Sequence, residues 1–168
     1  MDDKHYMELA IEAARESLAS DLLPVGAVAV QEGRLLGTGW KRGILHAHLD
    51  HAERNLMDTL MNDKTGRENL RGATIFTTLE PCLMCIGEML NLRVSRTVYA
   101  LDDPYGGGTC MLHPDLLPQR HKRDFMGLTS GVLDDIAVLL FRDFFRTTRS
   151  KYWKDPENPL WLQCMQGV

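Results

Sequence analysis

The sequence predicts an α/β layered domain with a mostly buried sheet, on the basis of three observations. Residues 5–19 repeat apolar side chains with the spacing of one helix face, residues 73–78 are β-branched and aromatic like a buried strand, and such segments alternate along the chain. Helices interleaved with strands are typical of layered α/β domains. With 168 residues, 44% of them hydrophobic, the chain is long enough for one domain with a proper core.

The first half of the chain predicts a hairpin and then a helix. Strands at residues 26–30 and 34–38 flank a Gln-Glu-Gly turn, which is a hairpin signal. Residues 39–50 are expected to form a loop. A helix is expected at residues 51–61, followed by a polar link at 62–71.

The second half continues the alternation. The strand at residues 73–78 leads to Pro81, which suits the first position of a helix because its missing N–H costs nothing there. The other predicted elements are the rest of that helix to residue 91, a strand at 96–101, a loop at 102–108, a short strand within 124–130 and a helix at 133–151. We therefore expect one domain over residues 1–151 and a C-terminal tail over 152–168.

The composition limits which cellular compartment and which binding partners are expected. The net charge of −4 gives no electrostatic reason to expect nucleic acid. The charged N-terminus predicts no signal peptide, and no stretch approaches the roughly 20 apolar residues of a membrane span. Four cysteines, two of them in a metal-binding pattern, fit a reducing compartment. We therefore expect a cytoplasmic protein without a membrane partner.

Two short segments have the pattern of a catalytic metal site. His51 and Glu53 form an H-x-E pair, and Cys82 and Cys85 form a C-x-x-C pair directly after Pro81. A catalytic zinc site uses about three protein ligands and leaves the fourth position for water. We predict that His51, Cys82 and Cys85 bind Zn²⁺, since this ligand set also favours zinc over harder ions. Glu53 then serves as the catalytic proton shuttle.

Spacing predicts where these four side chains lie. Cys82 and Cys85 are three residues apart, so they share a helix face, and in the first turn the helix dipole favours thiolate. His51 and Glu53 are two apart and do not share a face, so His51 is expected at a helix start. The C-x-x-C pair alone also fits a redox pair or half of a zinc knuckle. Neither alternative requires the H-x-E segment.

The other cysteines and nearby histidines fit a metal site less well. Cys110 and Cys164 have no ligand-like spacing around them. His46 and His48 lie close before His51 and are alternative ligands. Because three ligands are already present, we expect these two histidines to be exposed in the loop.

Four further segments accompany these motifs. They read Leu-Pro-Val-Gly-Ala at 23–27, Leu-Gly-Thr-Gly-Trp at 36–40, Thr-Leu-Glu directly before Pro81 and Phe-Phe-Arg at 144–146. With them, the chain resembles the cytidine deaminase-like superfamily, in the branch of tRNA adenosine, guanine and cytosine deaminases. The resemblance implies a three-layer α/β/α sandwich around a five-stranded mixed sheet. It also implies one Zn²⁺ per chain and a homodimer.

The resemblance further implies hydrolytic deamination of a purine or pyrimidine base. Glu53 is expected to take a proton from the attacking water, to deliver it to the ring nitrogen, and then to help the amine leave as ammonia. Backbone groups at Glu80 and Cys82 are expected to meet the amino group and the attacking oxygen. Ala52 is expected to let the backbone approach the base.

One position departs from the family pattern. The family commonly has Asn where this chain has Lys41, and the run from there to His51 is one residue short, so either Trp40 or Lys41 is expected to face the substrate. A solvated Lys41 is the alternative. Because Lys offers donors only, an inward Lys41 would select a carbonyl or anionic group. Asp102 is a further substrate-binding candidate by resemblance, and a turn role is its alternative.

The sequence favours a free nucleobase or nucleoside as the substrate, because of the acidic balance, Lys41 and the aromatic tail. The alternative is the wobble adenosine of tRNA, favoured by the Leu-Glu-Pro-Cys segment and by a basic cluster that could equally be a solvated helix end. That cluster comprises Arg142, Arg146, Arg149 and Lys151. A non-catalytic zinc domain is a third hypothesis, against which Glu53 argues.

The C-terminal tail holds Trp153 and Trp161 in a Pro-rich stretch that is expected to be non-helical. One interpretation is a lid that excludes water from the site. A dimer contact or a simply packed segment is the other.

Overall fold

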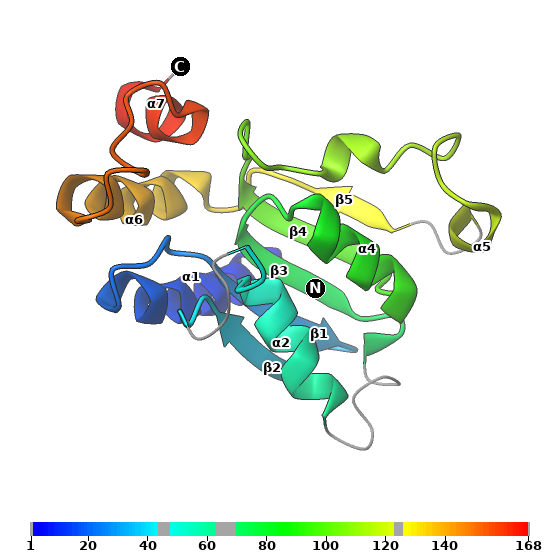
Figure 1. Ribbon diagram of the computed structural model, residues 1–168. Coiled ribbons are helices and arrows are strands. Elements are labelled where there is room, and N and C mark those ends of the chain that lie inside the picture. Colours follow the sequence, from blue (N-terminus) through cyan, green and yellow to red (C-terminus); the bar gives the residue numbers. More distant parts are fainter. Residues whose placement is uncertain (1, 44–47, 63–69, 123–125, 168) are drawn as a thin grey trace.

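The computed structural model describes residues 2–43, 48–62, 70–122 and 126–167, and within them five strands form one mixed sheet. The strand order is β2-β1-β3-β4-β5 (Figure 1). The elements, in chain order, are α1 (Asp3–Ala19), β1 (Gly26–Gln31), β2 (Arg34–Trp40), α2 (Ala52–Met61), β3 (Thr74–Leu79), α4 (Leu83–Leu92), β4 (Arg96–Leu101), η1 (Thr109–Met111), α5 (Gln119–Lys122), β5 (Gly127–Thr129), α6 (Asp134–Thr147) and α7 (Pro159–Gln166).

The sheet is the middle of three layers. Helices α2 and α4 cover one face, and α1 and α6 lie on the other (Figure 1). Strand β1 is antiparallel to both β2 and β3, whereas β3, β4 and β5 are parallel to one another. Helix α4 makes the crossover between the parallel strands β3 and β4, as such a connection requires. The predicted three-layer α/β/α sandwich around a mixed sheet is confirmed.

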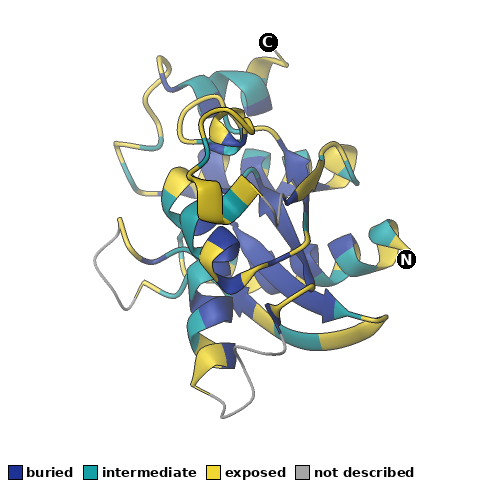
Figure 2. Cartoon of the chain, turned by 90° about the vertical axis from the view of Figure 1, so that its right-hand side faces the viewer, coloured by how far each residue is buried: buried dark blue, intermediate teal, exposed yellow. Residues whose placement is uncertain are grey.

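The central strands are buried on both faces, which explains their continuous apolar and β-branched sequences. All six residues of β3 are buried, as are five of six in β4. Figure 2 shows the buried residues running along these strands beneath a more exposed outer layer. No helix within the described ranges is long and apolar enough to cross a membrane.

Two glycines allow helices to lie directly on the sheet. A Cβ atom on Gly26 would stand 2.2 Å from the carbonyl oxygen of Ala10, so β1 and α1 touch backbone to backbone. A Cβ atom on Gly39 would stand 2.5 Å from the carbonyl oxygen of Ala52. This second contact fixes the first residue of α2, and therefore its start, against the end of β2.

Two predicted helix boundaries are wrong, for physical reasons. The helix after β3 begins at Leu83, with Cys82 as its N-cap in extended conformation, so Pro81 lies outside the helix instead of at its first position. The amide of Gly108 donates to the Pro81 carbonyl, which holds this segment as a turn. The last predicted helix ends at Thr147, because Thr148 has extended backbone.

The tail is helical, contrary to expectation. Asn158 caps α7 by accepting hydrogen bonds from the two amides of Leu160 and Trp161, and Pro159 occupies the first position, where proline is well tolerated. Helix α7 packs against α6: the Nε of Arg142 donates to the carbonyl oxygen of Cys164. These contacts make the tail a packed segment of the domain.

Trp153 fixes the start of the tail on α6. Its ring centroid lies 6.2 Å from that of Phe144 and 6.5 Å from that of Phe145. The two phenylalanines are almost fully buried, so their main contribution is to the core, and the Trp side chain is used in the same packing.

Candidate metal centre

His51 stands at the start of α2, as predicted. It is the N-cap residue with extended backbone, and its carbonyl accepts the first helical hydrogen bond from Asn55. The buried carboxylate of Asp50 accepts hydrogen bonds from the amides of Arg42 and Gly43 and from Nδ2 of Asn55. These bonds hold the end of the loop against α2, and so fix the residue directly before the imidazole.

The two thiols approach from α4. Cys82 is the N-cap and Cys85 is the third helical residue, so the first thiol lies just outside the helix and not within its first turn. Both remain at the positive end of the helix dipole, which favours thiolate. Cys85 is buried and Cys82 is half-buried, so the pair is reachable from one side only.

Three ligand atoms converge with the dimensions of a zinc site. Nδ1 of His51 lies 3.4 Å from Sγ of Cys82 and 3.7 Å from Sγ of Cys85, and the sulfurs are 3.7 Å apart. With Zn–S bonds of about 2.3 Å and Zn–N bonds of about 2.0 Å, a tetrahedral site needs separations of about 3.8 Å (S–S) and about 3.5 Å (S–N). The residues therefore fit zinc, with a fourth position left for water.

The remaining sulfur and imidazole groups lie outside this centre. Cys110 is exposed on η1, and Cys164 is a buried residue of α7. His48 is exposed, as expected, and His46 falls outside the described residues. Among the described residues, the metal-ligating atoms that lie close together here belong to His51, Cys82 and Cys85. This agrees with the prediction of three protein ligands.

The three ligand side chains differ in how strongly they hold a proton, because their pKa values are shifted in different directions. Hydrogen bonding from Cys85 lowers the pKa of Cys82 to about 4. The same bond raises the pKa of Cys85 well above its ordinary value, and burial adds to that rise. The hydrogen bond to Cys82 raises the pKa of His51. A bound cation would displace the protons on Cys85 and His51, because metal ligands must be deprotonated.

Glu53 lies beside the ligands in the first turn of α2. Its side chain is buried, Oε1 accepts a hydrogen bond of 2.9 Å from Oγ1 of Thr77, and Oε2 lies 3.7 Å from Sγ of Cys85. Burial raises the pKa of this carboxyl group above its ordinary value. A carboxyl of this kind, held next to a metal centre and shielded from bulk water, is suited to accept and return a proton near neutral pH.

Lys41 and Trp40 have different surroundings. The Nζ of Lys41 donates a hydrogen bond of 3.0 Å to the Asp50 carbonyl, and the charge of Glu53 is near enough to oppose the lowering of the Lys41 pKa by burial. The Trp40 ring is covered by the guanidinium of Arg42, 5.0 Å from its centroid. The Nζ of Lys41 therefore lies against the backbone of the residue before His51, whereas the Trp40 ring faces Arg42.

The remaining candidates differ in their exposure. Ala52 is fully buried as the first residue of α2, and the amide of Glu80 donates to the carbonyl of Leu101. Asp102 is exposed, and its carbonyl accepts a hydrogen bond from Gln163. The neighbouring Asp103 is the more enclosed of the two: burial raises its pKa, and the charges of Glu80 and Cys82 raise it further. Sequence reasoning missed Asp103, since two adjacent acids in a loop look alike.

Comparison with known proteins agrees with this geometry. The family described as "Cytidine and deoxycytidylate deaminase zinc-binding region" matches residues 1–101. A tRNA-specific adenosine deaminase of Bacillus subtilis (strain 168) is 34% identical over 152 residues, which cover 89% of this chain and 92% of that protein.

Two solved structures are similar in fold. One, described as "Biochemical and Structural Studies of A-to-I Editing by tRNA:A34 Deaminases at the Wobble Position of Transfer RNA", has a TM-score of 0.65 at 28% identity and covers 81% of this chain and 98% of its own. The other, Acinetobacter baumannii RibD, form 1, has a TM-score of 0.63 at 27% identity, with 84% of this chain matching only 38% of that longer one. Together with the metal centre, these matches show that the chain belongs to the cytidine and deoxycytidylate deaminase zinc-binding family and is a zinc-dependent deaminase.

Proposed function

We propose that this deaminase acts on adenosine within tRNA, at the wobble position, and converts it to inosine. The observation that carries this proposal is the similarity to a tRNA-specific adenosine deaminase over nearly the whole length of both chains. The sequence favoured a free base or nucleoside. The similarity covers nearly the whole length of the tRNA-specific enzyme and extends well beyond the metal-binding motifs. It therefore favours tRNA as the substrate.

The reaction replaces the exocyclic amino group by a carbonyl oxygen: one water is consumed, the C–N bond breaks and ammonia leaves. Zinc, when bound by His51, Cys82 and Cys85, supplies an acidified water near neutral pH. Glu53 takes one proton from the attacking water and passes it to the ring nitrogen, and it then carries the second proton of that water to the departing amine, which leaves as ammonia. The hydrogen bond from Thr77 leaves Oε2 as the oxygen that faces the ligands, and so orients the shuttle.

Substrate contacts are proposed at the rim of the centre. Ala52 allows the base to approach the backbone beside Glu53. The backbone at Glu80 meets the exocyclic amine. Lys41 donates to an acceptor on the nucleotide, and Trp40 and Asp102 border the same opening.

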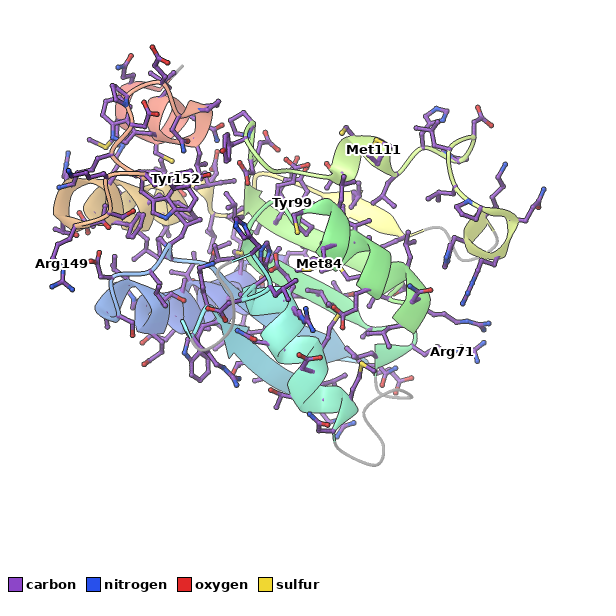
Figure 3. The ribbon with its side chains drawn as sticks, viewed as in Figure 1. Arg71, Met84, Tyr99, Met111, Arg149 and Tyr152 are labelled. Atoms are coloured by element: carbon purple, nitrogen blue, oxygen red, sulfur yellow. The ribbon has the colours of Figure 1, made fainter. Side chains whose placement is uncertain are left out.

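Basic side chains at two places support an RNA substrate. Arg146 and Lys151 are exposed, whereas Arg142 is occupied by the tail and Arg149 pairs with Asp21 at 3.2 Å. Figure 3 shows Arg149 at the edge of the molecule, where α6 ends. Helix α5 adds Arg120 and Lys122, both exposed, with the half-buried His121 between them. Local basic patches of this kind can bind RNA on a protein of negative net charge.

A free nucleobase or nucleoside is the second candidate, and Lys41 is the observation that favours it. A half-buried ammonium beside the centre offers only donors, so it suits a base that carries a carbonyl group there better than it suits adenine.

Ammonia release from the zinc-loaded protein separates the two candidates. The panel comprises free bases, nucleosides and a tRNA that carries adenosine at the wobble position, with Glu53→Ala as the inactive control. We expect inosine only in the tRNA. Turnover of a free base or nucleoside with inert tRNA would replace our proposal by the second candidate. The homodimer and the cytoplasmic location, which are also proposals, are tested by sedimentation of the purified protein and by cell fractionation.

A further inference from the structure

The carboxylate of Glu80 is surrounded by a loop that is distant in sequence. Oε2 accepts a hydrogen bond of 3.0 Å from the amide of Asp103, and Oε1 accepts bonds from the amide of Thr109 at 3.0 Å and from its hydroxyl at 2.5 Å. We call residues 103–109, which follow β4 and end at the first residue of η1, the glycine loop. Three donors on one ionised acceptor form a strong arrangement, because each bond is charge-assisted.

The glycine loop rests on the turn that carries the metal ligand Cys82. The amide of Gly108 donates to the Pro81 carbonyl at 3.0 Å, and a Cβ atom on Gly108 would stand 2.6 Å from the Leu83 amide nitrogen. A Cβ atom on Gly107 would stand 2.1 Å from Oε2 of Glu80. The Gly-Gly-Gly run is thus explained by close packing around the carboxylate and over the ligand turn.

This turn lies between α4, β4 and the glycine loop. The Cys82 carbonyl accepts a hydrogen bond from the Ile86 amide in α4, although the Cys82 side chain makes no capping hydrogen bond. The Glu80 amide donates to the Leu101 carbonyl at the end of β4. Glu80 therefore contacts both β4, through its amide, and the glycine loop, through its carboxylate.

We propose that the side chain of Glu80 is a positioning residue for the zinc ligand Cys82. Its carboxylate fixes the glycine loop, the loop fixes the turn from Glu80 to Leu83, and the turn sets the direction of the Cys82 sulfur. Groups behind a metal ligand commonly set its orientation, and their loss costs about 10–100-fold in metal affinity or activity. This role is separate from any contact of the Glu80 backbone with substrate.

The test measures zinc release from the full-length protein in Glu80→Gln and Thr109→Val. Gln keeps the shape but turns an NH2 group toward a backbone donor, and Val removes only the Thr109 hydroxyl. We expect zinc transfer to a chelator to be about tenfold faster in Glu80→Gln, and less accelerated in Thr109→Val. The double variant should be less than additive, because both changes act on one contact. Glu12→Gln, on the exposed face of α1, is the control and should release zinc at the unaltered rate.

Thermal unfolding with and without zinc separates positioning from general stability. Positioning predicts a smaller zinc-induced rise of Tm in Glu80→Gln. An equal drop of Tm in both forms, with unaltered zinc release, would overturn the proposal. If Glu80→Gln does not fold, Thr109→Val decides alone: unaltered zinc release would also overturn it. Zinc release does not depend on the substrate, so this result is independent of the proposed tRNA activity.

Discussion

Oγ1 of Thr77 in β3 donates a hydrogen bond of 2.9 Å to Oε1 of Glu53 in α2, and both side chains are buried. The bond joins the central strand to the helix that also carries His51 at its start. The proton shuttle is therefore fixed by the sheet, while its other oxygen is left beside the metal ligands.

Replacing Thr77 by Val should slow the reaction without loss of zinc. Val keeps the volume and removes the donor, so Glu53 loses orientation, and kcat should fall on the order of tenfold. The Thr77 bond lowers the Glu53 pKa, so its loss should raise that pKa and move the acid limb of the kcat profile to higher pH. A kcat profile of unchanged height and position would show that the bond has no catalytic role.

Replacing Glu53 by Gln should abolish turnover and leave zinc in place. Gln has the same shape but cannot accept the proton, so we expect a loss of about 10²–10⁴ in kcat. Zinc content by atomic absorption should match that of the unaltered protein. Retained turnover in Glu53→Gln would contradict the assigned shuttle.

Zinc binding should weaken as the pH falls. The pKa values of Cys85 and His51 are raised, so falling pH protonates both groups more readily and zinc must displace those protons, whereas the pKa of Cys82 is lowered to about 4. Each displaced proton changes the affinity about tenfold per pH unit. Chelator competition and proton release into a weak buffer, both at pH 6, 7 and 8, check this. A pH-independent affinity would contradict it.

Replacing Asp3 by Asn should destabilise the protein near neutral pH but not in acid. Both Nη atoms of Arg96 donate to the Asp3 carboxylate, at 2.9 and 2.7 Å, and this contact lowers the Asp3 pKa. A lowered folded-state pKa means that the stabilisation is present above the ordinary carboxyl pKa and is lost as pH falls through the folded value. We expect about 1 kcal/mol at pH 7 by urea unfolding. A difference between the two proteins that persists at pH 2 would show another cause.

The sequence alone predicted the order of the five strands and of helices α1, α2, α4 and α6, and it predicted the metal centre. Buried strands and amphipathic helices have local periods, so their alternation predicted the layers. The ligand set of His51, Cys82 and Cys85 could be identified because the residue types and their short spacings can be read directly from the sequence. The start of α2 followed from the two-residue spacing of His51 and Glu53, which excludes a shared helix face.

The expectation of a non-helical tail, which rests on its prolines, is wrong. Asn158 followed by Pro159 is instead a local signal for a helix start. The packing of α7 on α6 could not be predicted in the same way, because the hydrogen bond from Arg142 to Cys164 joins residues 22 positions apart.

Only the tertiary structure decided which polar groups surround the centre. The Nζ of Lys41 lies against the Asp50 carbonyl, directly before His51, whereas the Trp40 ring is covered by Arg42, and Asp103 is more enclosed than Asp102. The Glu80 carboxylate meets a loop 23 to 29 residues away. The hydrophobic periodicity of a sequence indicates only which face of a helix or strand is apolar. The partner of a buried polar group depends instead on where distant backbone donors arrive, and that is fixed when the layers pack.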